Sequence, residues 1–93
     1  MLATIPFNLE KLSKGDVDKE LLRAAIIAEL DAVNLYEQMA SLATDKDLKI
    51  ILLEVAREEK THVGEFQALL LRKDKQQQAE LKKGKEEVDD LLK

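Results

Sequence analysis

The chain has 93 residues, of which 37% are charged and 45% hydrophobic, with no cysteine, a formal net charge of -4 and a pI of about 5.0. The lack of cysteine excludes disulfides, thiolate metal sites and cysteine nucleophiles, and the length allows one domain over residues 1–93. Interspersed charges on an acidic chain argue against nucleic-acid and anionic-membrane partners, and no apolar run approaches the roughly 20 residues of a transmembrane helix, so a cytoplasmic protein is expected.

Residues 1–15 are predicted to form an extended N-terminal arm. Pro6 restricts Ile5 to extended conformations, and Gly15 marks the far end of the segment. Because the arm also carries several apolar residues, we expect it to pack along a helix or a neighbouring subunit.

Residues 16–73 are predicted to form a helical hairpin. Its first helix begins at Asp16, which can cap it, and neither glycine nor proline follows until Gly64. The residues of its apolar stripe recur at intervals of three and four: Leu22, Ile26, Glu29, Val33, Tyr36 and Ala40. An acidic residue, Glu29, therefore interrupts a stripe that otherwise belongs in a helical core.

The second helix of the hairpin is predicted from about residue 45 to residue 72. It follows a tight turn in which Thr44 and Asp47 resemble a capping box. Its apolar stripe contains polar residues at its centre: Leu48, Ile51, Leu52, Val55, Glu59, His62, Phe66, Leu69 and Leu70. Gly64 costs about 1 kcal/mol against alanine inside a helix, which a close approach of another helix would justify.

A polar joint and a shorter C-terminal helix are predicted over residues 74–93. The apolar residues of this helix are sparse and Gly84 interrupts it, which favours a role in packing or assembly. The expected fold class is therefore all-α, with an antiparallel two-helix hairpin followed by a short C-terminal helix.

Three polar residues of the hairpin are expected to lie at one level. Glu29 comes fifteen residues before position 44, and Glu59 comes fifteen residues after it. Because antiparallel helices rise equally per residue, these two carboxylates lie side by side. His62 follows Glu59 by three residues and shares its helix face.

Ionised carboxylates in an apolar seam cost several kcal/mol each unless a cation or hydrogen bonds compensate them. The helix angles of Arg57 and Lys60 turn those cations away from Glu59 and His62. A metal ion is the natural compensation, and carboxylate oxygen with imidazole nitrogen suits iron, manganese or zinc.

One chain supplies half of a recognised arrangement. Di-iron carboxylate bundles use a Glu from each of two helices and a Glu-x-x-His pair from each of the other two. Two chains related by a two-fold axis would supply four Glu and two His around two metal ions. The sequence thus predicts a metal site at a homodimer interface.

Each residue also has an ordinary explanation. Glu-x-x-His spacing often arises by chance on a solvent-facing helix, a lone core histidine is usually hydrogen-bonded, and seam acids can set helix register through salt bridges. The shared level and face of Glu29, Glu59 and His62 favour the metal site over these alternatives. Tyr36, two turns after Glu29, is either a residue that hydrogen-bonds a ligand carboxylate or an ordinary core tyrosine.

Two segments of the chain resemble a known family. Residues 28–38 and 58–66, with the spacing Glu, thirty residues, Glu, three residues, His, are similar to the encapsulated ferritins, which are ferritin-like proteins associated with encapsulin nanocompartments. The similarity covers roughly residues 16–92.

The resemblance implies half of a ferritin-like four-helix bundle, completed by homodimerisation, with dimers assembling into a ring, often a decamer. It places the iron ligands at Glu29, Glu59 and His62, with two iron ions per dimer interface, and a tyrosine beside the ligands at Tyr36. It implies a ferroxidase that oxidises Fe(II) to Fe(III) with dioxygen, while an encapsulin compartment stores the mineral. Some relatives are fused to the shell protein, so the chain is either one such domain or a free-standing protein.

In the expected mechanism, Glu59 of each chain bridges the two irons, and Glu29 and His62 each hold one of them. Two alternatives stay open at this point. One is a peroxide reductase of rubrerythrin type, which needs an electron donor; the lack of cysteine excludes a built-in rubredoxin domain. The other is a metal-free helical oligomerisation module.

Overall fold

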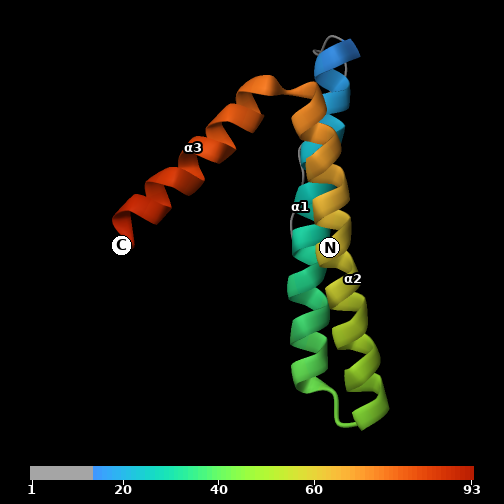
Figure 1. The fold of residues 1–93 in the computed structure, drawn as a ribbon. Coiled ribbons are helices and arrows are strands. Elements are labelled where there is room, and N and C mark those ends of the chain that lie inside the picture. Colours follow the sequence, from blue (N-terminus) through green and yellow to red (C-terminus); the bar gives the residue numbers. More distant parts are fainter. Residues whose placement is uncertain (1–13) are drawn as a thin grey trace.

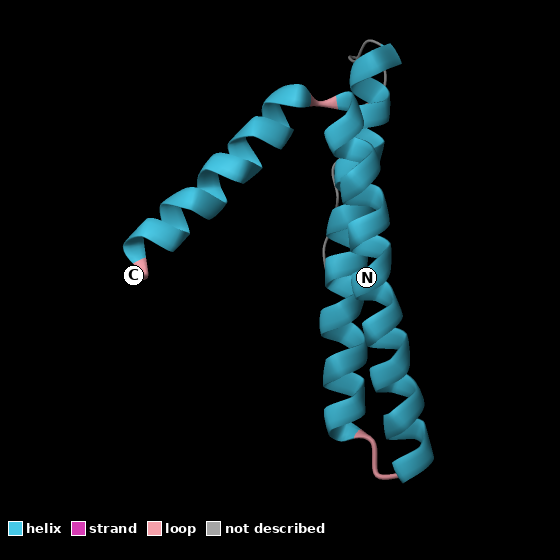
Figure 2. Cartoon of the chain, viewed as in Figure 1, coloured by secondary structure: helices cyan, strands magenta, loops and turns pink. Residues whose placement is uncertain are grey.

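The computed structural model describes residues 14–93, and the regular structure within this range is helical. Helix α1 (Lys14–Leu42) and helix α2 (Lys46–Lys73) run antiparallel as a hairpin, and α3 (Lys75–Leu91) leaves the open end of the hairpin at an angle (Figure 1). The three helices are joined by two short loops (Figure 2). The predicted all-α hairpin with a short C-terminal helix is confirmed. Most of the predicted arm, residues 1–13, lies outside the described residues.

The first helix begins earlier than predicted. It starts at Lys14 rather than at Asp16, so Asp16 lies in the first turn of α1. A carboxylate in this turn complements the positive end of the helix dipole, which accounts for an acid just inside the helix.

The turn between α1 and α2 forms where predicted, but its cap is one residue further along. Asp45 is the N-cap of α2, and its Oδ2 accepts a hydrogen bond from the Leu48 backbone N–H at 2.8 Å. The predicted capping box of Thr44 and Asp47 is therefore wrong. A carboxylate accepts from helix N–H groups more strongly than a hydroxyl does, and it also complements the helix dipole.

The core of the hairpin is narrow. Its buried apolar residues are Leu22, Val33, Ala40, Leu52, Ala56 and Leu70. Ala40 and Ala56 are each only 2% exposed, so small side chains allow close helix contact. Large apolar residues elsewhere on α2 stay in contact with solvent, including Ile50, Ile51 and Leu53, which are 54%, 59% and 49% exposed. One partner helix covers only a sector of α2, so a single chain leaves apolar surface uncovered.

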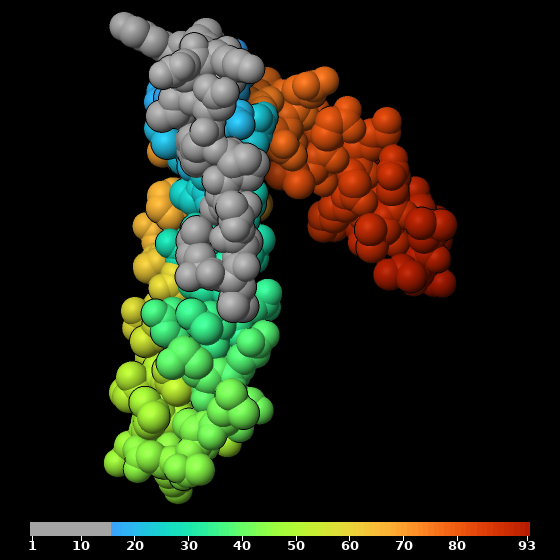
Figure 3. Space-filling model, turned by 180° about the vertical axis from the view of Figure 1, so that it is seen from behind, coloured from blue at the N-terminus to red at the C-terminus, as the bar shows by residue number. Residues whose placement is uncertain are grey.

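The third helix projects from the hairpin. Seen from behind, α3 extends as a separate rod from the end of the hairpin (Figure 3). Its N-terminal residue follows directly on Asp74, which is the C-cap of α2 and the N-cap of α3. Within residues 14–93, no helix is long and apolar enough to cross a membrane.

Candidate metal centre

The hairpin brings the three predicted site residues together. Glu29 comes from α1, and Glu59 and His62 come from adjacent turns of α2. The Nδ1 atom of His62 lies 3.3 Å from Oε2 of Glu29 and 3.4 Å from Oε2 of Glu59. One ligand atom from each residue lies within 4.8 Å of the other two. Two carboxylate oxygens and one imidazole nitrogen thus converge from both helices.

The common level of these residues follows from the register of the hairpin. The connection between α1 and α2 occupies residues 43–45, so its centre is the position from which Glu29 and Glu59 are equally distant in sequence. Each helical residue rises about 1.5 Å, and equal counts on antiparallel helices give equal heights. The prediction that Glu29, Glu59 and His62 meet at one level is borne out by their distances.

The two carboxylates are largely withdrawn from water. The side chain of Glu29 is 20% exposed and that of Glu59 is 18% exposed, whereas His62 is 44% exposed. Carboxylates with this little hydration need a cation or hydrogen-bond donors to offset the lost solvation. The imidazole of His62 faces both acids with the same nitrogen.

The nearby basic side chains of α2 are engaged elsewhere. Arg57 pairs with Glu54 at 2.6 Å, and Lys60 pairs with Glu37 of α1 at 3.3 Å. The hydrogen bond from Arg57 lowers the pKa of the Glu54 carboxyl and raises the pKa of the guanidinium in return. Neither cation is therefore directed at Glu59, as its position on the helix predicts.

The donor set and its spacing suit a transition-metal ion. Two atoms that share one ion at about 2.1 Å lie at most about 4 Å apart, so the separations of His62 Nδ1 from both carboxylates fit a common ion. Oxygen with imidazole nitrogen suits iron, manganese and zinc. Three ligand atoms leave coordination positions to be filled from outside this chain.

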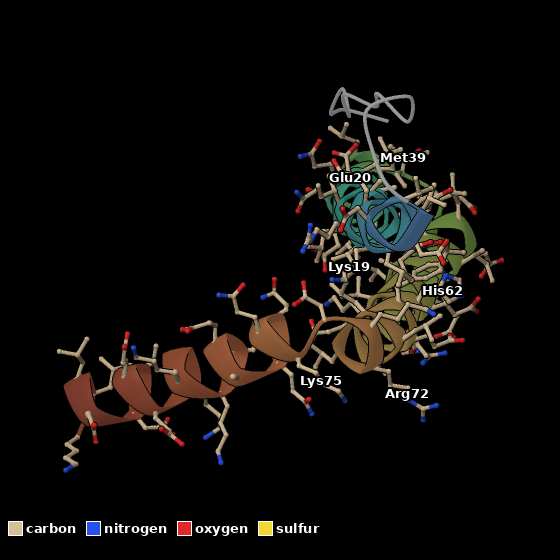
Figure 4. All side chains as sticks on the ribbon, turned by 90° about the horizontal axis from the view of Figure 1, so that it is seen from above. Lys19, Glu20, Met39, His62, Arg72 and Lys75 are labelled. Carbon is tan, nitrogen blue, oxygen red and sulfur yellow. The ribbon has the colours of Figure 1, made fainter. Side chains whose placement is uncertain are left out.

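A groove of about 320 Å³ opens beside the three residues. It is lined by Glu29, His62, Glu65 and Phe66. Glu65 is exposed and also borders this groove, as its position three residues after His62 allows. His62 lies on the side of the hairpin away from α3 (Figure 4).

Tyr36 lies further from the three residues than they do from one another. It is half-buried on α1, seven residues after Glu29, which corresponds to about 10 Å of helical rise. Its predicted hydrogen bond to a ligand carboxylate stays a prediction.

Known proteins match this chain over most of its length. The pattern of the EncFtn-like family matches residues 5–85. The chain is 65% identical over 86 residues to a ferritin-like-encapsulin shell fusion protein of Pyrococcus furiosus, an alignment that covers 92% of this chain and 23% of the fusion protein. It is 40% identical over 89 residues to the encapsulin nanocompartment cargo protein EncC of Myxococcus xanthus, covering 92% of this chain and 68% of that protein.

A solved structure shares the fold. The crystal structure of the encapsulated ferritin domain from Pyrococcus furiosus superposes with a TM-score of 0.83 at 55% identity, covering 98% of this chain and 95% of that one. The chain thus spans about a quarter of the fusion protein but nearly all of the solved ferritin domain. With a family match over residues 5–85 and a Glu-Glu-His group at the centre of its hairpin, the chain belongs to the EncFtn-like family.

Proposed function

We propose that this chain is half of a di-iron ferroxidase, which two copies complete by joining their hairpins across the Glu29, Glu59 and His62 face. The observation that supports this proposal most directly is the convergence of three ligand atoms within 4.8 Å from two helices. Each ferrous ion would give up one electron, and dioxygen would accept the electrons.

The number of ligands argues for two copies. One chain offers two carboxylates and one imidazole, so two chains offer four carboxylates and two imidazoles. This is the set of a di-iron carboxylate bundle, in which two helices each give a Glu and two each give a Glu-x-x-His pair. Four carboxylates also carry the charge that balances two Fe(II) ions. A single hairpin leaves apolar surface exposed on α2, and a second copy could bury this surface.

Each of the three candidate ligands has a proposed role in binding iron. Glu59, next to His62 on α2, would be shared by the two ferrous ions, and Glu29 and His62 would each hold one of them. His62 presents Nδ1 to both carboxylates, so Nδ1 is the proposed ligand nitrogen. The groove bordered by Glu65 and Phe66 leaves one side of the group accessible to a small oxidant.

The names of the relatives suggest where this chemistry takes place. One is a fusion of a ferritin-like part with an encapsulin shell, and the other is a cargo protein of an encapsulin nanocompartment. We propose that this chain likewise supplies ferric iron inside an encapsulin shell, which stores it. Dimers would associate further, and the predicted ring, such as a decamer, is the form proposed for that assembly.

A pair of neighbouring substitutions tests the activity. Glu59→Gln removes a proposed ligand, whereas Glu58→Gln removes an adjacent exposed acid and serves as the matched control. Oxidation of Fe(II) in air, followed by the absorbance of the ferric product, should fall more than about tenfold in the first variant and stay near the original rate in the second. Equal rates in the two variants would contradict the proposal.

The choice of oxidant separates ferroxidase from peroxide reductase. We expect iron oxidation to proceed with dioxygen alone and to need no added electron donor. A protein that oxidises Fe(II) only with hydrogen peroxide, and then requires a reductant to turn over, would instead be of the rubrerythrin type. Metal analysis together with mass in solution tests the remaining alternative, because a metal-free oligomer indifferent to added iron would be a structural module.

A further inference from the structure

The joint between α2 and α3 is built around one carboxylate. Asp74 is the only charged side chain among the described residues that is counted as buried, with 9% of its surface exposed. Its backbone N–H donates to Leu70 O at the end of α2, and its Oδ1 accepts from Gln77 N–H at the start of α3 at 3.0 Å. The same residue therefore ends one helix and begins the next.

A cation from α1 occupies the other oxygen of this carboxylate. Arg23 Nη2 donates to Asp74 Oδ2 at 2.7 Å, across a separation of 51 residues. Capping of α3 uses only Oδ1 of Asp74. The contact between Arg23 and Oδ2 is therefore not needed to cap either helix. It ties the joint to the body of the hairpin through a charge-assisted bond, which is short and directional.

An apolar cavity lies next to this contact. A cavity of about 340 Å³ lies between the three helices and is lined by Arg23, Ile26, Ile27, Gln67, Leu70, Gln77 and Leu81. Beyond Leu81 the same stripe of α3 runs on to Val88 and Leu92, seven and eleven residues later, which are 52% and 78% exposed. The base of α3 thus touches the hairpin while its outer half stands free.

We infer that the Arg23–Asp74 pair, here called the elbow pair, fixes the direction in which α3 leaves the hairpin. A single residue, Asp74, separates α2 from α3. Helix caps determine where a helix begins, but they do not set its direction relative to a third helix. The elbow pair supplies that third reference point, because it joins α1 to the hinge itself. The outer apolar stripe of α3 is thereby held at one orientation.

The elbow pair is separate from the metal centre. Arg23 and Asp74 line neither the groove beside Glu29 nor the group around His62, and α3 points away from the side of the hairpin where His62 lies (Figure 4). The inference therefore does not rest on the proposed iron chemistry, and either can fail without the other.

Distances between spin labels test the elbow directly in the full chain. The protein has no cysteine, so cysteines introduced at exposed Gln38 on α1 and exposed Lys83 on α3 carry the two labels without background. Labelled chains are mixed with an excess of unlabelled chains, so that distances within one chain dominate. We expect one narrow distance distribution when the elbow pair is intact.

Two variants break the pair in different ways. Arg23→Gln removes the cation, and Asp74→Asn removes the charge while keeping a side-chain oxygen that caps α3. Each should broaden the distance distribution, and the double variant should be no broader than the wider of the two, because the partners act as a unit. Arg57→Gln, which breaks an exposed pair on α2, is the control and should leave the distribution narrow.

Unchanged distributions in both variants would overturn the inference, and so would broadening in Asp74→Asn alone, since that would assign the orientation to capping. Circular dichroism of each variant establishes that its three helices are still formed. With helicity retained, broadening in both single variants supports the elbow pair as the element that aims α3.

Discussion

His62 is the residue on which the chemistry of the candidate site most depends. It is the only histidine in the chain, and its Nδ1 faces Glu29 and Glu59 at nearly equal distances. The two acids come from different helices, so the imidazole sits where the seam between them is most polar. A neutral imidazole at this point offers a lone pair to a metal ion, and no other nitrogen ligand of this type exists in the sequence.

Replacing His62 by alanine should therefore lower metal affinity about 10- to 100-fold without unfolding the hairpin, because the side chain is 44% exposed and fills little of the core. Zn(II) binding, measured by calorimetry, gives the affinity, and free imidazole in the buffer should restore part of it by occupying the vacated position. His62→Gln is the control for size. Full affinity in the alanine variant would remove His62 from the ligand set.

The sequence predicts the three candidate ligands but not the whole lining of the groove beside them. Glu29, Glu59 and His62 were placed together by counting from the turn, because helical rise is uniform and sequence spacing converts directly into height. Glu65 was not recognised as part of the groove, since an exposed acid three residues after a histidine is also what any solvated helix face carries. Only the depth of the groove distinguishes the two cases, and depth depends on neighbouring side chains.

Local sequence rules predict the ends of helices α2 and α3 to within a residue or two. These rules do not predict the direction in which α3 leaves the hairpin. The sequence indicated a polar joint after Lys73, but the contact that anchors the joint pairs Asp74 with Arg23, 51 residues earlier. Such a pairing depends on which face of α1 meets the end of α2. The spacing of Asp74 and Gln77 did carry a capping signal that identifies the start of α3.

Gly64 has open space around it within the described chain. A close helix approach would explain a glycine inside α2, yet a Cβ built at Gly64 would meet nothing within 4 Å in the described chain. Gly64→Ala should therefore stabilise the protein by about 0.5–1 kcal/mol, through the lower entropy of the unfolded chain and the better helix propensity of alanine.

Thermal unfolding at fixed protein concentration measures this effect. Gly84→Ala is a matched control on α3, where a Cβ also meets nothing within 4 Å, and it should change the midpoint in the same direction. A lower midpoint for Gly64→Ala alone would mean that a second copy approaches α2 closely at this position.

The joint between α2 and α3 should also respond to acid. The backbone hydrogen bond from Gln77, assisted by the hydrogen bond from Arg23 and the positive charges of Lys19 and Arg23, lowers the pKa of the Asp74 carboxyl below its ordinary value of 3.8. A lowered pKa in the folded state means that the stabilisation is fully present above the ordinary value and is lost as the pH falls through the folded value.

We therefore expect the difference in stability between the unmodified chain and Asp74→Asn to be constant near neutral pH and to shrink below pH 3.8. Denaturant titrations at a series of pH values measure the difference. The exposed Glu54–Arg57 pair gives the comparison, because Glu54→Gln should change stability little at any pH. A difference that persists unchanged at the lowest pH would assign the effect of Asp74→Asn to packing rather than charge.

In the whole molecule, the narrow hairpin core and the group of three candidate ligands both bear on the proposed pairing of two hairpins. Six apolar residues are buried among the described ones, while large apolar side chains on both hairpin helices and α3 stay exposed. The carboxylates of Glu29 and Glu59 lie in that incompletely covered seam. A second hairpin packed on this face would cover apolar surface and bring two further carboxylates toward the first two. Without a cation, those charges oppose the association that the apolar surface favours.

Metal removal should therefore weaken the proposed dimer. A ligand that binds only the associated state stabilises it by about 2.7 kcal/mol at a concentration 100 times its dissociation constant, so chelation should shift the monomer–dimer equilibrium toward monomer by roughly the corresponding factor of 100. Sedimentation of the chain with Zn(II), and again after chelation and dialysis, measures the shift. Glu59→Gln should respond little to either treatment, because it carries less charge and binds metal weakly. If the unmodified chain has the same dimer affinity with and without metal, the two copies do not share a metal site across their interface.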